Sequence, residues 1–126
     1  MGLNKPVDFT TAKLLKEKGF NKSTTKVYGQ VLLDTFKLVN YNFTKMGEEG
    51  GFQNAPYYYA PTIAEVVMWL YEKHGIWVSV MITNDFKMFY YNIRSKEAIW
   101  YTGTNLNSPK ESYTSAIKYC LTKLIK

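Results

Sequence analysis

The residues that could carry polar chemistry are few, since the chain has one histidine, His74, and one cysteine, Cys120. A histidine can act as a general base, and a cysteine thiolate as a nucleophile or metal ligand. No nucleophile or orienting carboxylate is spaced around His74 as such catalysis needs. Cys120 falls on the apolar side of an expected helix, where a thiol is a small core residue. The sequence therefore predicts structural roles for both, and no catalytic residue.

The acidic residues do not indicate a metal or phosphate site. With one His and one Cys, a metal site would have to be rich in carboxylates, and the acids lack the spacing of a calcium loop. The segment Gly47-Glu-Glu-Gly-Gly51 lacks the Lys-Ser/Thr ending of a phosphate-binding loop, and its two acids would repel phosphate. We therefore predict no metal and no cofactor.

Aromatic residues give the better indication of function. The segment Pro56-Tyr57-Tyr58-Tyr59-Ala60-Pro61 holds three phenols in an extended stretch, where at most alternate rings can pack inward. At least one of these tyrosines is therefore expected to face solvent. Trp69 falls roughly 100° from the centre of the apolar side of its helix, so we expect it at the exposed edge.

Two further rings fall on one face of an expected β-hairpin. Trp77 and Tyr90 share that face with Met81 and Met88. The face is therefore amphiphilic, and it must be either covered by another part of the protein or exposed to water. The long loop, the first helix or a second subunit in a homodimer could cover it. If nothing covers this face, it would form an exposed apolar patch of the kind that marks a partner site. The predicted binding residues are Tyr57, Tyr58, Tyr59, Trp69, Trp77 and Tyr90.

The composition limits the class of partner. The chain has 126 residues, 46% of them hydrophobic, and a net charge of +6, with cations spread evenly along it. Arg94 is the only arginine among sixteen cations, so the forks that read guanine and phosphate bidentately are nearly missing. Sequence-specific nucleic-acid binding is therefore disfavoured. Non-specific binding of single strands, with bases stacked on Trp77 and Tyr90, stays as the alternative.

The chain shows no sign of a membrane or secreted protein. Its longest strongly apolar stretch, residues 76–82, is far short of the ~18 residues that cross a bilayer. The N-terminal residues carry no apolar run of signal-peptide length, and the single cysteine cannot form an internal disulfide. We expect a cytoplasmic protein that does not enter the membrane.

Helix and turn signals place these residues on elements. Asp8 is a good N-cap for a helix over residues 9–18 that stops at Gly19. The signatures Thr62-x-x-Glu65 and Ser108-x-x-Glu111 each predict a capping box, opening helices over residues 63–74 and from residue 109 to the C-terminus. The apolar side of the first of these includes Tyr71 and His74.

The remaining segments indicate strands and loops. Residues 27–43 alternate as two strands with a turn or bulge near Asp34-Thr35. Residues 44–61 contain strong breakers at four places, Gly47, Gly50-Gly51, Pro56 and Pro61, which is typical of a long loop. Residues 76–83 and 86–94 flank Asn84-Asp85, which suits a two-residue hairpin turn. That turn would pair Val78 with Tyr91. A strand over residues 98–102 and a polar loop over 103–107 follow.

These elements predict a single α+β domain over residues 1–126, in the order α-β-β-α-β-β-β-α. We expect an antiparallel sheet of about five strands, with the helices packed mainly on one face.

The stretches 60–76 and 108–120 resemble a group of small uncharacterised proteins from bacteriophages and mobile elements of gut bacteria. The similarity extends over residues 5–126 in order and is weakest over 21–60. The matching motifs are helix starts and helix faces, so the resemblance implies a shared fold but no activity. The functional hypothesis is a non-catalytic module that binds a protein through its exposed aromatic residues.

Overall fold

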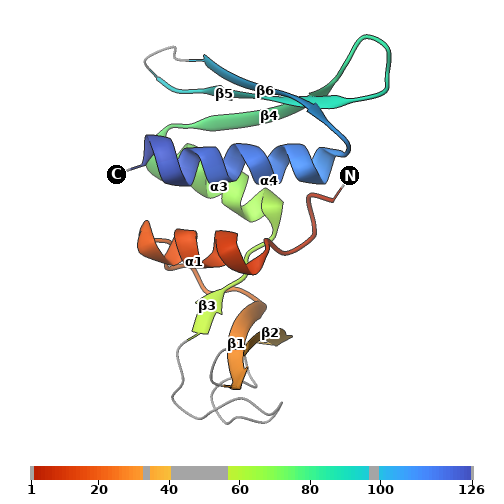
Figure 1. Ribbon diagram of the computed structural model, residues 1–126. Helices are drawn as coiled ribbons and strands as arrows, with labels where there is room; N and C mark the ends of the chain where they lie inside the picture. Colours follow the sequence, from red (N-terminus) through yellow and green to blue (C-terminus); the bar gives the residue numbers. More distant parts are fainter. Residues whose placement is uncertain (1, 33–34, 41–56, 97–99, 126) are drawn as a thin grey trace. The chain divides into compact units, whose positions relative to one another are not determined.

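The computed structural model describes residues 2–32, 35–40, 57–96 and 100–125. The chain divides into two compact units, which we call the small unit (Pro6–Pro61) and the large unit (Met1–Lys5 and Thr62–Lys126). Each contains helix and a three-stranded antiparallel sheet (Figure 1). The α+β class is confirmed, whereas the prediction of one sheet of about five strands is wrong. The prediction of a single domain is not tested by this division, because two compact units can still unfold together.

The elements fall into two consecutive groups along the chain. Those of the small unit are α1 (Phe9–Glu17), β1 (Lys26–Leu32), β2 (Thr35–Asn40) and β3 (Tyr57–Tyr59); those of the large unit are α3 (Ile63–His74), β4 (Trp77–Ile82), β5 (Phe89–Arg94), β6 (Trp100–Leu106), α4 (Pro109–Tyr119) and a π-helical turn, η1 (Cys120–Leu124).

Helix α1 begins and ends at the residues that its sequence predicts. The Asp8 carboxylate accepts a hydrogen bond from the Thr11 N–H at 2.8 Å. At the other end Gly19 has a φ of 92°, and the Phe20 N–H donates to the Leu15 carbonyl at 2.9 Å. This is a Schellman stop, which brings Phe20 back onto the last turn, where it is buried.

The sheet of the small unit has the order β2-β1-β3. Strands β1 and β2 pair as predicted, with a register shift between Gln30 and Leu32; the expected turn falls partly on residues 33–34, outside the described residues. Strand β3 corrects the prediction of a loop over 44–61, because Tyr57–Tyr59 pair antiparallel with residues 27–29 of β1. Aromatic side chains suit a half-buried pleated surface. The rest of that stretch, residues 44–56, also lies outside the described residues.

Helix α3 confirms its predicted start and end. The Thr62 side chain accepts from the Glu65 N–H at 3.2 Å, while the Glu65 carboxylate accepts from the Thr62 N–H at 2.9 Å. Two N–H groups without a partner inside the helix are thus satisfied reciprocally. Gly75 ends the helix in the left-handed conformation, with a φ of 66°.

The hairpin of β4 and β5 forms with a longer turn than predicted. The Thr83 N–H donates to the Met88 carbonyl, and this hydrogen bond closes a loop of four residues, 84–87. The Asp85 carboxylate accepts from the Lys87 N–H and the Thr83 hydroxyl, which holds this wider turn. Val78 therefore pairs with Ile93 rather than Tyr91. A shift of two residues keeps every side chain on its predicted face, because the strand period is two.

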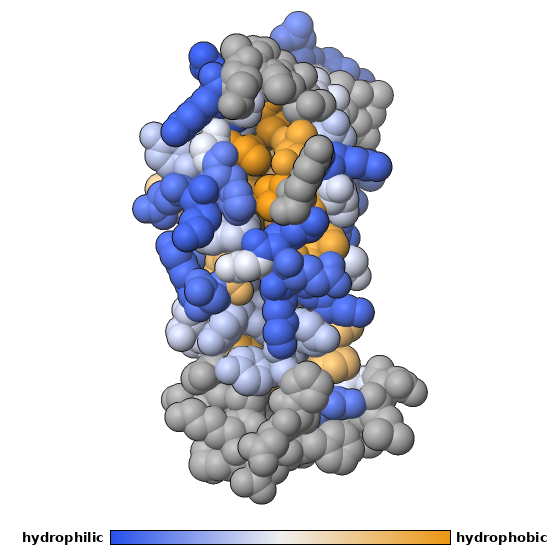
Figure 2. Space-filling view, turned by 90° about the vertical axis from the view of Figure 1, so that its left-hand side faces the viewer, coloured by the Kyte–Doolittle hydropathy of each residue, from blue (hydrophilic) through white to orange (hydrophobic). Residues whose placement is uncertain are grey.

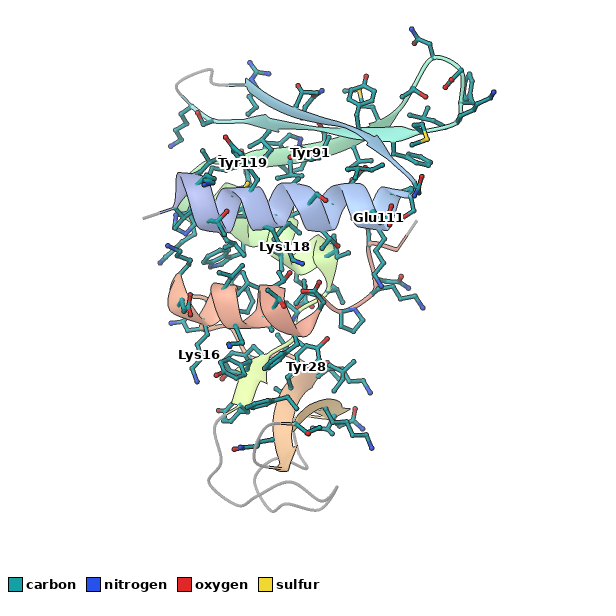
Figure 3. The ribbon with its side chains drawn as sticks, viewed as in Figure 1. Lys16, Tyr28, Tyr91, Glu111, Lys118 and Tyr119 are labelled. Carbon is teal, nitrogen blue, oxygen red and sulfur yellow. The ribbon has the colours of Figure 1, made fainter. Side chains whose placement is uncertain are left out.

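Strand β6 also differs from the prediction, since it runs from Trp100 to Leu106 and includes most of the expected polar loop. Gly103 makes this pairing possible. It lies opposite Tyr91, and a Cβ at Gly103 would come within 2.1 Å of the Tyr91 ring. The ring, on the α4 side of the sheet (Figure 3), takes the space that a side chain would need.

The core of the large unit lies between its sheet and its two helices, which cover one face of the sheet (Figure 1). Helix α4 begins at the predicted Pro109 but ends at Tyr119, where η1 follows and the Ile125 N–H donates to the Cys120 carbonyl. The Glu111 carboxylate accepts from the Asn107 N–H rather than from the N-cap residue Ser108. Among the described residues of this unit, the fully buried apolar side chains are Ile63, Val66, Leu70, Val78, Ile93, Ala116, Ile117, Cys120 and Leu121.

Candidate recognition surface

Trp69 corrects the expectation of an exposed edge, because only 3% of it is exposed. The buried side of α3 is rotated from Tyr71 toward Trp69, so Tyr71, predicted to be buried, is 55% exposed. The Trp69 ring meets the His74 imidazole edge-on, with ring centroids 4.8 Å apart. Trp69 therefore belongs to the core and cannot stack on a partner in this conformation.

His74 lies at the half-buried edge of that core, as predicted. Its Nε2 is buried without a hydrogen-bond partner among the described residues. Burial, followed by the nearby charge of Lys73, lowers the pKa of His74. The imidazole is therefore neutral near pH 7, where it packs against Trp69.

The Cys120 thiol is buried and free. Burial raises its pKa to about 12, so the reactive thiolate is not populated at neutral pH. Among the described residues, no three His, Cys, Asp or Glu side chains are grouped as a metal site would need.

The three tyrosines of β3 are all half-buried and belong to the small unit. The rings of Tyr57 and Tyr59 meet edge-on, with centroids 5.7 Å apart. Tyr58 lies on the other face of the sheet, among rings from other elements. The six predicted binding residues are thus divided between the units, since Trp69, Trp77 and Tyr90 belong to the large unit.

The rings around Tyr58 form what we call the aromatic cluster of the small unit: Phe9, Tyr28, Phe36 and Tyr58. Phe9 contacts the other three rings at centroid distances of 4.7–5.6 Å. The Lys16 ammonium lies 4.9 Å from the centre of the Tyr58 ring and donates to the Tyr57 carbonyl. The Tyr28 hydroxyl, on the same unit (Figure 3), donates to the Val7 carbonyl at 2.7 Å. These contacts fix the rings in place, so the cluster is structural.

The large unit carries its rings differently, on the sheet face that α3 and α4 do not cover. Trp77 and Met81 are each 44% exposed there, and the half-buried Tyr90 donates a hydrogen bond to the Met81 sulfur. Tyr71 meets Trp77 edge-on from α3, with ring centroids 5.6 Å apart. We call Tyr71, Trp77, Met81, Tyr90 and Arg94 the outer surface. It is a group of three aromatic side chains, one methionine and one arginine that water reaches.

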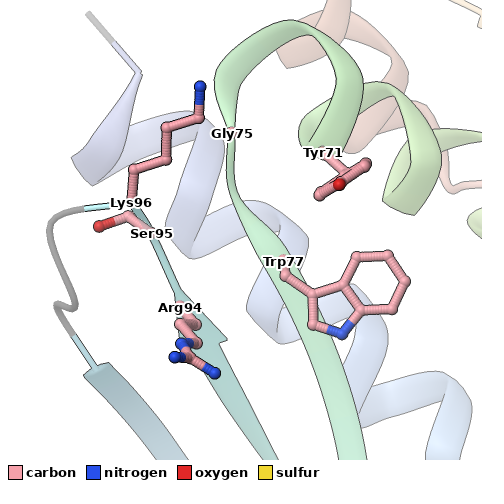
Figure 4. A pocket seen from close by; sticks show the side chains of 6 residues that line it. All are labelled: Tyr71, Gly75, Trp77, Arg94, Ser95 and Lys96. Carbon is pink, nitrogen blue, oxygen red and sulfur yellow. The ribbon is translucent and has the colours of Figure 1, made fainter.

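A pocket of about 280 Å³ lies at one end of the outer surface. Figure 4 shows the rings of Tyr71 and Trp77 on one side of β4, and Arg94, Ser95 and Lys96 across from them. Arg94 pairs with Trp77 across the strands. Lys96 lies against Gly75, since a Cβ at Gly75 would come within 3.2 Å of it. The pocket thus has an aromatic wall and a cationic wall, and none of the described residues that line it is acidic.

Figure 2 shows further apolar side chains in the upper part of the view, bordered by hydrophilic ones. A second pocket, of about 470 Å³, is formed near the start of α4 by Leu106, Asn107, Lys110, Glu111, Thr114 and Ser115. In it, Glu111 already accepts from the Asn107 N–H and donates its own N–H to Ser108. This pocket contains none of the predicted binding residues.

Sequence reasoning missed two residues of the outer surface, Tyr71 and Arg94. The hydrophobic pattern predicts Tyr71 on the apolar side of its helix, because periodicity does not show that this side is rotated toward Trp69. The composition distinguishes Arg94 only as the single arginine. The strand parity that put Trp77 outside also puts Arg94 outside, and this signal could have joined them.

Comparison with family models, with curated proteins and with solved structures gave no match. The resemblance to bacteriophage and mobile-element proteins stays a prediction. Within the residues that the structure describes, every helix is too short or too polar to cross a bilayer.

Proposed function

We propose that this protein is a non-catalytic module that binds a protein partner through the outer surface. The observation that carries the proposal is the exposure of Tyr71, Trp77 and Met81, which lie together on or beside one sheet face. Aromatic residues, methionine and arginine are enriched in protein interfaces. Trp, Tyr and Arg are also the residues that most often dominate binding energy.

The chemistry of the surface favours binding over catalysis. Its side chains offer apolar area, one guanidinium and two phenols, while Cys120 lies in the core and His74 at the half-buried edge of the core. The Tyr90–Met81 hydrogen bond and the Asn92–Thr102 hydrogen bond hold side chains of this face in place. A surface fixed before binding loses less entropy when a partner docks.

Selection from a displayed library of random peptides tests the proposal. Peptides selected on the wild type should bind Trp77→Ala at least about tenfold more weakly, the effect of losing a residue worth more than about 1.4 kcal/mol. Leu38→Ala is the matched control, because Leu38 is also an exposed large apolar residue, at 36%, but belongs to the small unit. Equal binding to wild type and Trp77→Ala would contradict the proposal.

A homodimer is the version of the proposal in which the partner is a second copy. Light scattering distinguishes it, since Trp77→Ala and Met81→Ala should then turn a dimer into a monomer. If the wild type is a monomer at all concentrations, the partner is a different protein.

Single-stranded nucleic acid is the second candidate, and the Trp77–Arg94 pair favours it. A base could stack on the indole while Arg94 and Lys96 neutralise phosphate. Anisotropy of a labelled oligothymidine should then show binding that weakens steeply as salt rises. Oligothymidine binding that requires Trp77 and weakens as salt rises supports this candidate. If the oligothymidine does not bind in this way, the result supports a protein partner.

A further inference from the structure

We propose that the pocket between Tyr71–Trp77 and Arg94–Lys96 binds a carboxylate of the partner, either an acidic side chain or the end of a chain. The apolar stem of that group would lie against the Trp77 indole. This inference rests on the proposed function for one assumption, that the partner is a protein. The evidence for an anion site comes from the pocket alone.

The charges of the pocket select an anion. Arg94 and Lys96 are the two ionisable side chains with a formal charge among its described lining residues, and both are cationic. A guanidinium presents a planar fork of donors that matches the two oxygens of a carboxylate. The Lys96 side chain lies against Gly75, where no Cβ occupies the space that it uses. The cationic wall therefore consists of Arg94, at the end of β5, and Lys96, which follows two residues later.

The opposite wall selects what is attached to the anion. The Trp77 indole is 44% exposed, and Tyr71 braces it edge-on. An exposed indole offers apolar area to a methylene stem or a second ring. An anion joined to an apolar stem would contact both walls at once, whereas an inorganic anion would contact only one.

The size of the pocket suits a small group. At about 280 Å³ it falls just below the range of roughly 300–1,000 Å³ that drug-sized ligands occupy. A side chain or a chain end fits such a volume. Because the inference rests on the proposed function, the group assigned to the pocket belongs to a protein partner, and a nucleotide is the alternative that the experiment must exclude.

A matched pair of small probes tests the site without the unknown partner. N-acetylphenylalanine carries a carboxylate at pH 7, and N-acetylphenylalaninamide has the same ring and stem without the charge. NMR titration would follow the indole N–H of Trp77, assigned through Trp77→Phe. We expect the acid to shift this signal to saturation, and the amide to bind at least about fivefold more weakly.

Charge variants separate the site from general attraction to a basic protein. Arg94→Gln and Lys96→Gln should each weaken binding of the acid at least about threefold. Lys87→Gln, an exposed cation of the hairpin turn that does not line the pocket, should leave it unchanged. Both pocket cations are exposed, so their variants should fold, which a proton spectrum would verify.

Four outcomes would overturn the inference. If the acid and the amide bind equally, the pocket binds apolar groups and does not recognise a carboxylate. Equal losses in Lys87→Gln and Arg94→Gln would show only long-range attraction. Tighter binding of adenosine monophosphate than of the acid would assign the pocket to nucleotides. If library peptides still require Trp77 but bind with neither an acidic residue nor a free C-terminal carboxylate, the proposed function stands and this inference fails.

Discussion

The two units use aromatic rings in opposite ways. In the small unit, Phe9 touches three rings, and the cluster is half-buried and flanked by lysines. In the large unit, Trp77 meets one ring among the side chains that the structure describes, that of Tyr71, and nearly half of the Trp77 side chain is exposed. The number of rings in a segment therefore does not mark a binding surface. The number of ring neighbours in the fold separates a structural cluster from a surface that can accept a partner.

The largest expected effect tests the structural side of this comparison. Phe9→Ala should lower the free energy of unfolding by about 2–3 kcal/mol, because it removes apolar area and three ring contacts at once. Urea unfolding followed by far-ultraviolet circular dichroism would measure this loss. A loss below about 0.5 kcal/mol would remove the distinction between the cluster and the outer surface.

The same variant shows whether the two units unfold together. All three tryptophans lie in the large unit, so indole fluorescence reports on that unit directly. If the chain is one cooperative domain, Phe9→Ala shifts the fluorescence and dichroism transitions equally. If the units are independent, fluorescence keeps its wild-type midpoint and only dichroism shifts.

The next effect concerns the inner face of the large sheet. Gly103→Ala should cost about 1–2 kcal/mol, because the new methyl group must displace the half-buried Tyr91 ring. Thermal unfolding would give the loss, and a double-mutant cycle with Tyr91→Ala identifies its cause. In the Tyr91→Ala background the cost of Gly103→Ala should shrink; an unchanged cost would place the strain elsewhere.

The ends of α3, which nearby residues specify, could be predicted to the residue, whereas a strand that depends on a distant partner could not. Thr62, Glu65 and Gly75 specify both ends of α3 from positions within or next to the helix. Strand β3 exists because Tyr57–Tyr59 pair with β1, some thirty residues earlier in the chain. No local pattern records that pairing, so the segment was predicted to be a loop.

The candidate site shows the same division. Strand parity placed Trp77 on the outer face, and it stayed there although the turn lengthened, because the register moved by two residues. The exposure of Trp69 and Tyr71 depended on a rotation of α3 that its neighbours in the fold decide. When aromatic residues lie at both margins of the apolar side of a helix, hydrophobic periodicity predicts the width of that side better than it predicts which residues lie at its centre.

A smaller effect is expected from pH, and it again separates core from surface. The pKa of His74 is lowered in the fold, so the unfolded chain binds more protons as pH falls through the ordinary histidine range near 6.5. Stability should therefore be constant above that range and decrease below it. Melting temperatures between pH 7.5 and 5.5 should fall more for the wild type than for His74→Asn. Parallel curves for the two proteins would show that His74 titrates freely.

The smallest effect on stability is expected where the effect on binding is largest. Trp77→Ala should lower the free energy of unfolding by less than about 1 kcal/mol, since it removes one edge-on contact and a half-exposed ring. The same change should weaken a selected peptide at least about tenfold. Phe9→Ala should show the reverse, a large loss of stability and little change in peptide affinity once the protein is folded. If Trp77→Ala instead destabilises the chain as much as Phe9→Ala does, the indole is structural as well. The outer surface would then be a second cluster rather than a site.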